Sequence, residues 1–367
     1  MKLLKYSSFF SNCSNENLHI DYKINGINIT EQICLNYTRK EICGYDCACG
    51  LCYTYDNGCK YSVRKKIYVN CKIMCRCTIN ILEKYNYDVV ELHLSHSNIL
   101  GLLDLTKFIL LNKLICSSNE IMNINNLSKT LVHLDISFNL IDKINIKYLT
   151  NLEYLKCSYN KLSNNDSIIL PTNIKFLDCS NNYLKDKFDI SNLDNLEIFI
   201  CSFNDISEII FPNSNKLKKL EITCNQIKSL ENIPNSVEYL NCSNNHICYN
   251  FTLPDSLKIL DCSQCYFTSL DNLPRELVEL ICSENYVKTL NNLPGRLEIL
   301  YCRLNQLTQL DFLPSSLKIL YCGDNNSLSN LDNLNYGLEE LECYNCVKIK
   351  NLDNLPITIK QLFSKKK

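Results

Sequence analysis

The sequence lacks any imbalance of charge and any long apolar run. Its 38 lysines and arginines offset 39 aspartates and glutamates, so the net charge is −1 over 367 residues. A chain with this balance has no electrostatic basis for binding nucleic acid or an anionic membrane surface. No stretch approaches the roughly 18 consecutive apolar residues that a membrane-spanning helix needs. We therefore expect a protein that binds neither nucleic acid nor membrane.

A secretion signal is also missing. Residues 1–11 carry a lysine inside a short apolar run and have no small-residue cleavage site, so they make a poor signal peptide. We expect an intracellular protein located in the cytoplasm, which is the host cytoplasm if the source is a virus.

The sequence has no catalytic signature. The patterns G-x-S-x-G, G-x-G-x-x-G, H-E-x-x-H and the P-loop are all missing, so we expect no enzyme. Tryptophan is absent, Ala48 is the single alanine, and lysine outnumbers arginine 32 to 6. This bias is typical of A+T-rich genomes, so Asn-rich or Lys-rich stretches are not by themselves functional. We expect His93, His96 and His133 to be plain surface residues.

A short motif recurs along most of the chain. The segment 152–162 (LEYLKCSYNKL) reappears at 174–184, 237–247, 277–287 and 297–307, with the shared pattern L-x-x-L-x-C-S-x-N-x-L. Thirteen copies and a truncated one begin between residues 89 and 359, at a mean spacing of about 21 residues. Numbering each copy from 1 to 11, we expect positions 1, 4 and 6 to point into a solenoid and positions 3, 5 and 7 to point outward. The strands should stack in parallel, one from each repeat.

This pattern resembles the leucine-rich repeat family, whose period is about 20 to 29 residues. The resemblance implies a β-rich horseshoe solenoid of the α/β class, with a parallel sheet on its concave face where protein partners bind. It also implies that the Asn at position 9 bonds to backbone groups of neighbouring turns, which makes it a structural residue. In general terms the chain is similar to short leucine-rich repeat proteins of A+T-rich genomes, including giant viruses of amoebae.

All eight prolines lie in the linkers between repeats. Seven of them precede the next repeat by three residues, in an L-P-x-x-L spacing that resembles the short repeats of secreted bacterial effectors. Because proline fixes φ and extends its predecessor, we expect an extended or polyproline-like convex side with short 3₁₀ turns.

Ten cysteines occupy position 6 of the repeats. Side chains in register on parallel strands point the same way, which does not suit the crossing geometry of a disulfide. We expect these cysteines to act as small apolar core residues rather than as a disulfide or metal ladder. Two more, Cys265 and Cys346, replace the Asn of position 9.

A second group of ten cysteines lies within the first 77 residues, where the spacing C-x3-C-x-C occurs twice. The second copy resembles the disulfide cap of extracellular leucine-rich repeat proteins, although the fourth cysteine expected soon after Cys77 is missing. Thiolates also bind Zn²⁺, and Cys49-x2-Cys52 is a common type of ligand pair. Zinc, disulfides and unligated thiols all stay open. The candidate metal ligands are Cys43, Cys47, Cys49, Cys52, Cys71, Cys75 and Cys77.

Upstream of the repeats the apolar period changes to two. Residues 20–24 and 27–29 alternate apolar and polar side chains around Asn25-Gly26, which predicts a β-hairpin with a tight turn. The first strand of a parallel solenoid exposes an edge and an apolar core that must be covered. We therefore expect a small Cys-rich β cap over residues 1–85 and the solenoid over residues 86–367.

The resemblance places partner binding on the outward strand positions. Aromatic residues beside charged ones suit a protein interface, although the same residues are also ordinary strand formers on a solvated sheet. We expect a non-enzymatic, monomeric module that binds a protein partner and whose one candidate cofactor is zinc at the N-terminal cysteines. The alternatives are a substrate-recognition subunit of a ubiquitin ligase with a zinc-binding N-terminal segment, and a virion or cell-surface scaffold with oxidised cysteines. The candidate contact residues are Tyr154, Tyr159, Phe176, Phe203, Tyr239, Tyr301, Tyr321, Glu340 and Glu342.

Overall fold

The computed structural model describes residues 22–24, 27–29, 52–55, 58–61, 74, 76–247 and 252–364. The chain divides into two compact units, Met1–Lys84 and Tyr85–Lys367. The first unit contains short antiparallel strand pairs, and the second contains the repeats.

In the first unit, β1 (Tyr22–Ile24) pairs antiparallel with β2 (Ile27–Ile29). This pairing confirms the hairpin that the period-two pattern predicts around residues 25 and 26. A second antiparallel pair joins β3 (Cys52–Tyr55) to β4 (Gly58–Tyr61). Helix α3 (Arg76–Leu82) follows them in the chain.

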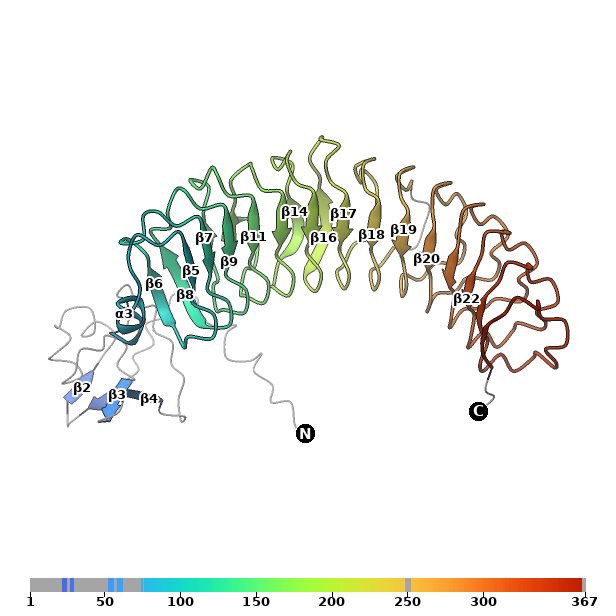
Figure 1. Ribbon diagram of the computed structural model, residues 1–367, viewed down its shortest axis with the longest axis horizontal. Coiled ribbons are helices and arrows are strands. Elements are labelled where there is room, and N and C mark those ends of the chain that lie inside the picture. The colour runs from blue at the N-terminus through green and yellow to red at the C-terminus, as the bar shows by residue number, and fades with distance from the viewer. Residues whose placement is uncertain are drawn as a thin grey trace. The chain divides into compact units, whose positions relative to one another are not determined.

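A single parallel sheet of fourteen strands runs through the second unit. Its strands follow one another in chain order from β5 to β24 (Figure 1). Each comes from positions 3 to 5 of one repeat, which confirms the predicted solenoid with one strand per repeat. The strands are β5 (Glu91–His93), β7 (Lys113–Ile115), β9 (His133–Asp135), β11 (Tyr154–Lys156), β13 (Phe176–Asp178), β15 (Ile198–Ile200), β17 (Lys219–Glu221), β18 (Tyr239–Asn241), β19 (Ile259–Asp261), β20 (Glu279–Ile281), β21 (Ile299–Tyr301), β22 (Ile319–Tyr321), β23 (Glu340–Glu342) and β24 (Gln361–Phe363).

The core is a stack of side chains from positions 1, 4 and 6, as the motif predicts. Leu152, Leu155 and Cys157 are completely buried, and Leu155 lies opposite Leu134 of β9 and Leu177 of β13. A slip of one residue would turn each position-4 leucine out of the core, so this column fixes the register. Burying one leucine side chain stabilises the fold by about 1.5 to 3 kcal/mol. One repeat cannot bury its own apolar face, so the stack is stable only as an array.

Position 7 differs from the prediction. The motif predicts an outward side chain there, yet Ser137, Ser158, Ser180 and Ser202 are buried. At Ser180 the hydroxyl donates to Oδ1 of Asp178 at 2.5 Å, and Asp178 is itself buried. A small hydroxyl that turns back to its own strand is covered by it, so position 7 adds little exposed surface in these four repeats.

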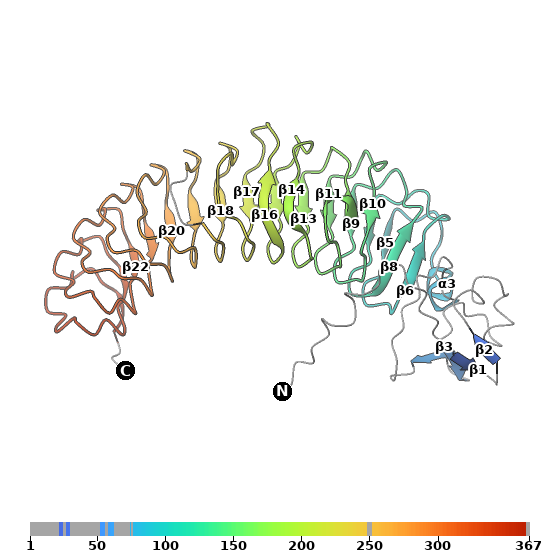
Figure 2. The same cartoon turned by 180° about the vertical axis from the view of Figure 1, so that it is seen from behind.

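Several linkers in the first half of the array contain extended segments that pair with one another, most of them in linkers without proline. Parallel pairs form between β6 (Leu100–Asp104) and β8 (Glu120–Asn125), β10 (Ile144–Asn145) and β12 (Ile168–Ile169), and β14 (Lys185–Asp189) and β16 (Asp205–Ile210). A 3₁₀ turn, η1 (Asn165–Ser167), precedes β12. Figure 2 shows β6 beside β8 and β14 beside β16. The sequence pattern does not predict this pairing, because its register depends on linker lengths that vary from repeat to repeat.

The prolines begin the turn that returns the chain to the sheet. The carbonyl of Pro234 accepts a hydrogen bond from the Val237 N–H at 3.0 Å, and the carbonyl of Pro254 is used in the same way. Leu149 and Leu152 form this turn at 3.0 Å without a proline. Proline, with its fixed φ, therefore favours a turn that other repeats also adopt.

The Asn at position 9 is the polar centre of the ten turns that carry it. Nδ2 of Asn182 donates to the carbonyls of Cys179 and Ser180 in its own repeat and of Cys157 in the preceding one, at 3.0 to 3.1 Å. Its Oδ1 accepts the N–H of Leu162 in the preceding repeat at 3.1 Å. These bonds satisfy backbone groups that would otherwise be buried without partners. Equivalent bonds form at Asn119, Asn139, Asn160, Asn204, Asn225, Asn245, Asn285, Asn305 and Asn325.

Cysteine takes over part of this role at two turns. Sγ of Cys265 lies 3.2 Å from the carbonyl oxygen of Cys242, and Sγ of Cys346 lies 3.4 Å from that of Cys322. In each case the thiol contacts the position-6 carbonyl of the preceding turn, as the amide does elsewhere. A thiol has one weak donor where the amide has two donors and an acceptor, so these two turns have fewer of the bonds.

Position 8 has a left-handed backbone in all thirteen complete repeats, with φ between 52° and 58°. Asn tolerates this conformation, but Phe138, Tyr159 and Leu304 adopt it as well. The conformation costs about 1 to 2 kcal/mol for an ordinary L residue. The conformation also occurs before Ser97, Cys265 and Cys346, where position 9 is not Asn. The backbone of the turn therefore sets the conformation whatever residue stands there.

We expect Asn182→Ala to lower the free energy of unfolding by about 3 kcal/mol, because it leaves several buried backbone groups without partners. Hydrogen exchange at the Leu162 amide, which loses its acceptor, should speed up more than exchange at other strand-flanking amides. The control is Cys265→Asn, which restores the amide at a cysteine-bearing turn and should leave stability equal or higher. Unchanged exchange at Leu162 would show that the amide does not hold the turn.

Candidate interaction surface

The sheet face is the surface formed by positions 3, 5, 7 and 8 of the repeats. All the predicted contact residues belong to these positions, but they differ in exposure. Tyr159 and Phe203 are exposed, and Glu342 is buried. The half-buried ones are Tyr154, Phe176, Tyr239, Tyr301, Tyr321 and Glu340.

Three rings stack at position 3 near the start of the array. His133 lies 4.0 Å from Tyr154 and Tyr154 lies 4.2 Å from Phe176, measured between ring centroids, with interplanar angles of 6°. Parallel strands about 4.8 Å apart place identical positions at stacking distance. Burial lowers the pKa of His133, and the charge of Lys113 lowers it further. The imidazole is therefore neutral at physiological pH, and the column presents an uncharged aromatic surface.

A second aromatic column forms at position 8. Phe138 stacks on Tyr159 at 4.1 Å with an interplanar angle of 10°, and Phe203 follows two repeats later in the same column. All three side chains are about half exposed, at 47%, 47% and 53%. The left-handed turn directs this position away from the core, which places large apolar groups in solvent. Exposed aromatic side chains of this kind supply much of the energy of protein interfaces.

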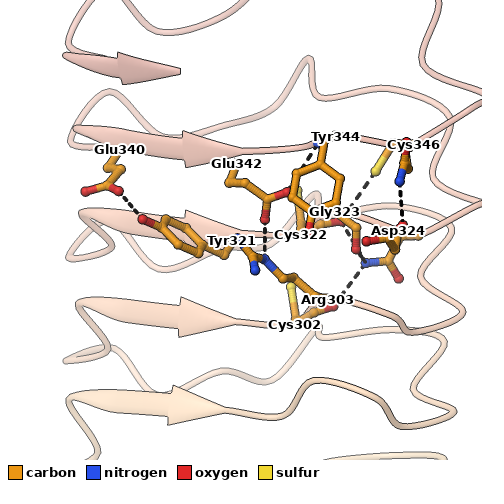
Figure 3. Close-up of polar contacts among 12 residues, drawn as sticks. Cys302, Arg303, Tyr321, Cys322, Gly323, Asp324, Glu340, Glu342, Tyr344 and Cys346 are labelled. Atoms are coloured by element: carbon orange, nitrogen blue, oxygen red, sulfur yellow. Dashed lines mark hydrogen bonds and ion pairs between the residues drawn. The ribbon is translucent and has the colours of Figure 1, made fainter. Parts of the chain in front are cut away.

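A polar cluster lies on the sheet face near its C-terminal end (Figure 3). Nε of Arg303 lies 2.5 Å from Oε2 of Glu342, and the guanidinium covers the rings of Tyr321 and Tyr344 at 4.9 and 5.2 Å. The ion pair joins position 7 of one repeat to position 5 of the repeat two turns later. It passes over Gly323, where a Cβ would collide with Oε1 of Glu342 and lie 3.0 Å from the Tyr344 carbonyl oxygen.

Glu342 therefore differs from its predicted role. Its side chain is 2% exposed and paired with Arg303, so it offers no free carboxylate to a partner. Glu340, on the same strand, is half-buried and accepts a hydrogen bond from the Tyr321 hydroxyl. That bond, with burial and the charge of Glu340, raises the pKa of Tyr321 to about 12.

Among the residues that the structure describes, the remaining charge on the C-terminal third of the sheet face is acidic. Ile299 and Ile319 lie opposite each other at position 3 and form a half-buried apolar strip, and Ile281 at position 5 lies opposite Tyr301. Leu304 at position 8 is 50% exposed. Carboxylates occupy other positions of the same face, while the charge of Arg303 is already paired. They are Asp261, Glu279, Glu284, Asp324 and Glu340.

A shallow cleft of about 400 Å³ opens at the ends of strands β15 to β19. Phe203, Cys224, Asn244, His246 and Tyr266 line it, together with position-9 asparagines. Nδ2 of Asn244 lies 3.1 Å from Sγ of Cys224. Position 10 therefore extends the candidate surface beyond the strands, which the motif did not indicate.

The histidines and the N-terminal cysteines are placed as follows. His93 lies 3.5 Å from Glu91 at the first strand, and within the described ranges no three His, Cys, Asp or Glu side chains are grouped to hold a metal ion. Of the predicted cysteine ligands, Cys77 is a half-buried residue of α3, and Cys52 belongs to β3. The other five, Cys43, Cys47, Cys49, Cys71 and Cys75, lie outside the described residues.

No model of a known protein family and no curated protein matches the sequence. Solved structures do match. YopM, a leucine-rich effector protein from Yersinia pestis, matches with a TM-score of 0.58 and 25% identity, over 75% of this chain and 88% of that one. The functional domain of InlJ from Listeria monocytogenes, which includes a cysteine ladder, matches with a TM-score of 0.55 and 24% identity, over 72% and 67%. The Arabidopsis receptor kinase HAESA, solved with the peptide hormone IDA and the co-receptor SERK1, matches with a TM-score of 0.52 and 21% identity, over 75% and 54%.

The fold is that of the leucine-rich repeat proteins. The position-6 cysteines occupy core positions of this leucine-rich repeat array, where Cys157, Cys179 and Cys201 on successive turns are completely buried. Burial raises the pKa of all three thiols, so they remain protonated. Among the residues that the structure describes, no helix is long and apolar enough to cross a membrane.

We expect Gly323→Ser, which restores the serine found at position 7 of most repeats, to destabilise the protein by about 1 to 3 kcal/mol through overpacking against Glu342. Thermal unfolding of the original protein and of the Gly323→Ser variant measures this difference in stability. The matched test is the pair Gly323→Ser and Glu342→Ala, singly and together. Removing the carboxylate makes room for the new side chain, so the two effects should not add. Additive effects would mean that Gly323 does not make room for the ion pair.

Proposed function

We propose that this protein is a non-enzymatic module that binds another protein through the sheet face. The observation that carries the proposal is the row of half-exposed rings at position 8, Phe138, Tyr159 and Phe203. The left-handed turn fixes the direction in which each side chain leaves the backbone. A rigid, exposed aromatic side chain loses little conformational entropy on binding, which suits an interface anchor.

The charge distribution favours one class of partner. The C-terminal third of the sheet face combines an apolar strip of isoleucines with Asp261, Glu279, Glu284 and Asp324. A protein segment that carries apolar side chains flanked by lysine or arginine complements this surface in both respects. We propose that such a segment binds there, while the position-8 rings contact the rest of the partner.

The structural neighbours support a binding role at a general level. HAESA was solved with a peptide hormone and a co-receptor, and YopM is described as an effector protein. An extended repeat surface provides shape without fixing chemistry, so the partner of this chain is set by its own side chains.

Peptides selected from a random display library on the full chain should be rich in Lys or Arg next to Leu, Ile or Phe, because the C-terminal sheet face is acidic and apolar. We expect Glu279→Lys with Glu284→Lys to lower the affinity for the selected peptides by about tenfold or more. This loss of affinity should be smaller at high salt. Binding is measured by fluorescence anisotropy.

The matched control is Tyr336→Ala, which removes an 81% exposed ring from a linker and should leave peptide affinity unchanged. Selection of acidic peptides, or equal weakening by Tyr336→Ala and the charge reversals, would overturn the assignment of the surface. For the aromatic column, Tyr159→Ala with Phe203→Ala should reduce recovery of a full-length partner in cross-linking, again relative to Tyr336→Ala.

We further propose that the N-terminal cysteines bind zinc and that the protein works in the cytoplasm as a monomer. Reduced thiols throughout the repeats suit a reducing compartment. Zinc at residues 43–77 would also be the first requirement of the alternative function, substrate recognition for a ubiquitin ligase.

Elemental analysis of the full chain purified under reducing conditions should find zinc at a ratio of at least one per chain, because clustered thiolates bind it tightly. Replacing Cys49 and Cys52 together by serine should release the metal, while Cys224→Ser in the repeats should not. A metal-free protein, or disulfides among these cysteines in non-reducing mass spectrometry, would count against the zinc proposal.

A further inference from the structure

Two thiols from consecutive turns meet near the C-terminal end of the sheet. Cys346 stands at position 9 of the last complete repeat, and its Sγ lies 3.4 Å from the carbonyl oxygen of Cys322 in the preceding repeat (Figure 3). The side chains of Cys322 and Cys346 also shift each other's pKa. The Cys346 thiol therefore already lies against Cys322 in the reduced protein.

The fold explains why the Cys346 sulfur lies against Cys322 of the preceding turn. Every position-9 Asn side chain reaches back to the position-6 carbonyl of the preceding turn, as the Asn325 side chain reaches the carbonyl of Cys302 at 3.0 Å. The side chain of a cysteine at position 9 points in the same direction. The objection to disulfides among position-6 cysteines, which point the same way, does not apply to a pair that joins position 9 to position 6.

Cys346 also has access to solvent. A cleft of about 300 Å³ is lined by Cys343, Cys346, Ile349 and Lys350, which is space for part of a small organic molecule. Cys265 makes the same kind of contact with Cys242, but its side chain is completely buried while Cys346 is 5% exposed. The described repeats thus contain one such pair at a cleft and one enclosed pair of the same design.

The two thiols of the accessible pair are inequivalent. The hydrogen bond with the Cys322 thiol lowers the pKa of Cys346, against the effect of burial, and the Asn325 backbone lowers it further. The same hydrogen bond, together with burial, raises the pKa of Cys322. A thiolate therefore forms more readily at Cys346, on the cleft, than at Cys322 in the core.

We propose that Cys346 and Cys322 form a thiol–disulfide exchange site for low-molecular-weight disulfides such as oxidised glutathione. The Cys346 thiolate attacks one sulfur of the small disulfide, whose S–S bond breaks and releases one thiolate. Cys322 then loses its proton to that thiolate and attacks the Cys346 sulfur, which releases the second small thiolate. This thiolate takes up from solvent the proton that Cys346 gave up when its own thiolate formed. The protein gains one Cys322–Cys346 disulfide, and the small disulfide is reduced to two thiols.

Cys343 is the competing partner, since it precedes Cys346 by three residues and lines the same cleft. Burial raises its pKa to about 12, and the Sγ of Cys346 lies against the carbonyl of Cys322 instead. The geometry therefore favours a bond between turns over a bond within one turn.

The test treats the reduced, native full chain with oxidised glutathione, quenches with acid and an alkylating agent, and maps each cysteine by non-reducing peptide mass spectrometry. We expect a glutathione adduct at Cys346 first and a Cys322–Cys346 disulfide next, with Cys346 reacting about tenfold or more faster than the enclosed Cys265. Cys322→Ala should accumulate the adduct at Cys346, because the resolving thiol is gone.

Cys346→Asn is the matched variant, since it supplies the position-9 amide found in most repeats and keeps the turn while removing the thiol. It should show neither adduct nor disulfide in this cleft, and circular dichroism should confirm that it is folded. A Cys343–Cys346 bond, reaction at Cys346 no faster than at Cys265, or no adduct in Cys322→Ala would each overturn the proposal.

Discussion

The position-9 amide joins every turn that carries it to the turn before. In Asn182 a single side chain bonds to three carbonyls and one N–H, and two of these four groups belong to the preceding repeat. Apolar burial fixes the register of the strands, but it provides no directed bond between one turn and the next. The position-9 amide provides such bonds. They also close the tight corner after each strand, and the backbone shape of that corner determines where the next side chains point.

The surface chemistry depends on that corner. Position 8 is left-handed in every complete repeat, so its side chain leaves the core whatever its character, and Tyr159 and Phe203 are held in solvent. Because the strands stack in register, the same position on adjacent turns forms a column, and rings such as those of Tyr154 and Phe176 stack at 4.2 Å. The rigid scaffold and the variable face are thus separate sets of positions in one short motif.

The motif predicts what repeats from copy to copy. Strands at positions 3 to 5, buried leucines, the Asn ladder and its two cysteine replacements all follow from the pattern of one repeat and its period. It does not predict what arises between copies. The ion pair of Arg303 with Glu342 requires that the intervening turn has glycine at position 7, and the meeting of Cys322 with Cys346 requires the direction of a side chain across turns. The motif likewise does not predict the buried serines at position 7 or the pairing of the linkers, because both depend on neighbouring turns.

The reach of Arg303 has a consequence for how the array unfolds. In a repeat protein each turn ordinarily contacts only its immediate neighbours, so the ends fray one turn at a time. Arg303 and Glu342 lie two turns apart, and their ion pair passes over Gly323 while the guanidinium also covers the rings of Tyr321 and Tyr344. Three turns are therefore coupled beyond nearest neighbours. Opening of either outer turn leaves a charge of the other without its partner, so the segment from β21 to β23 should open as one cooperative block rather than turn by turn.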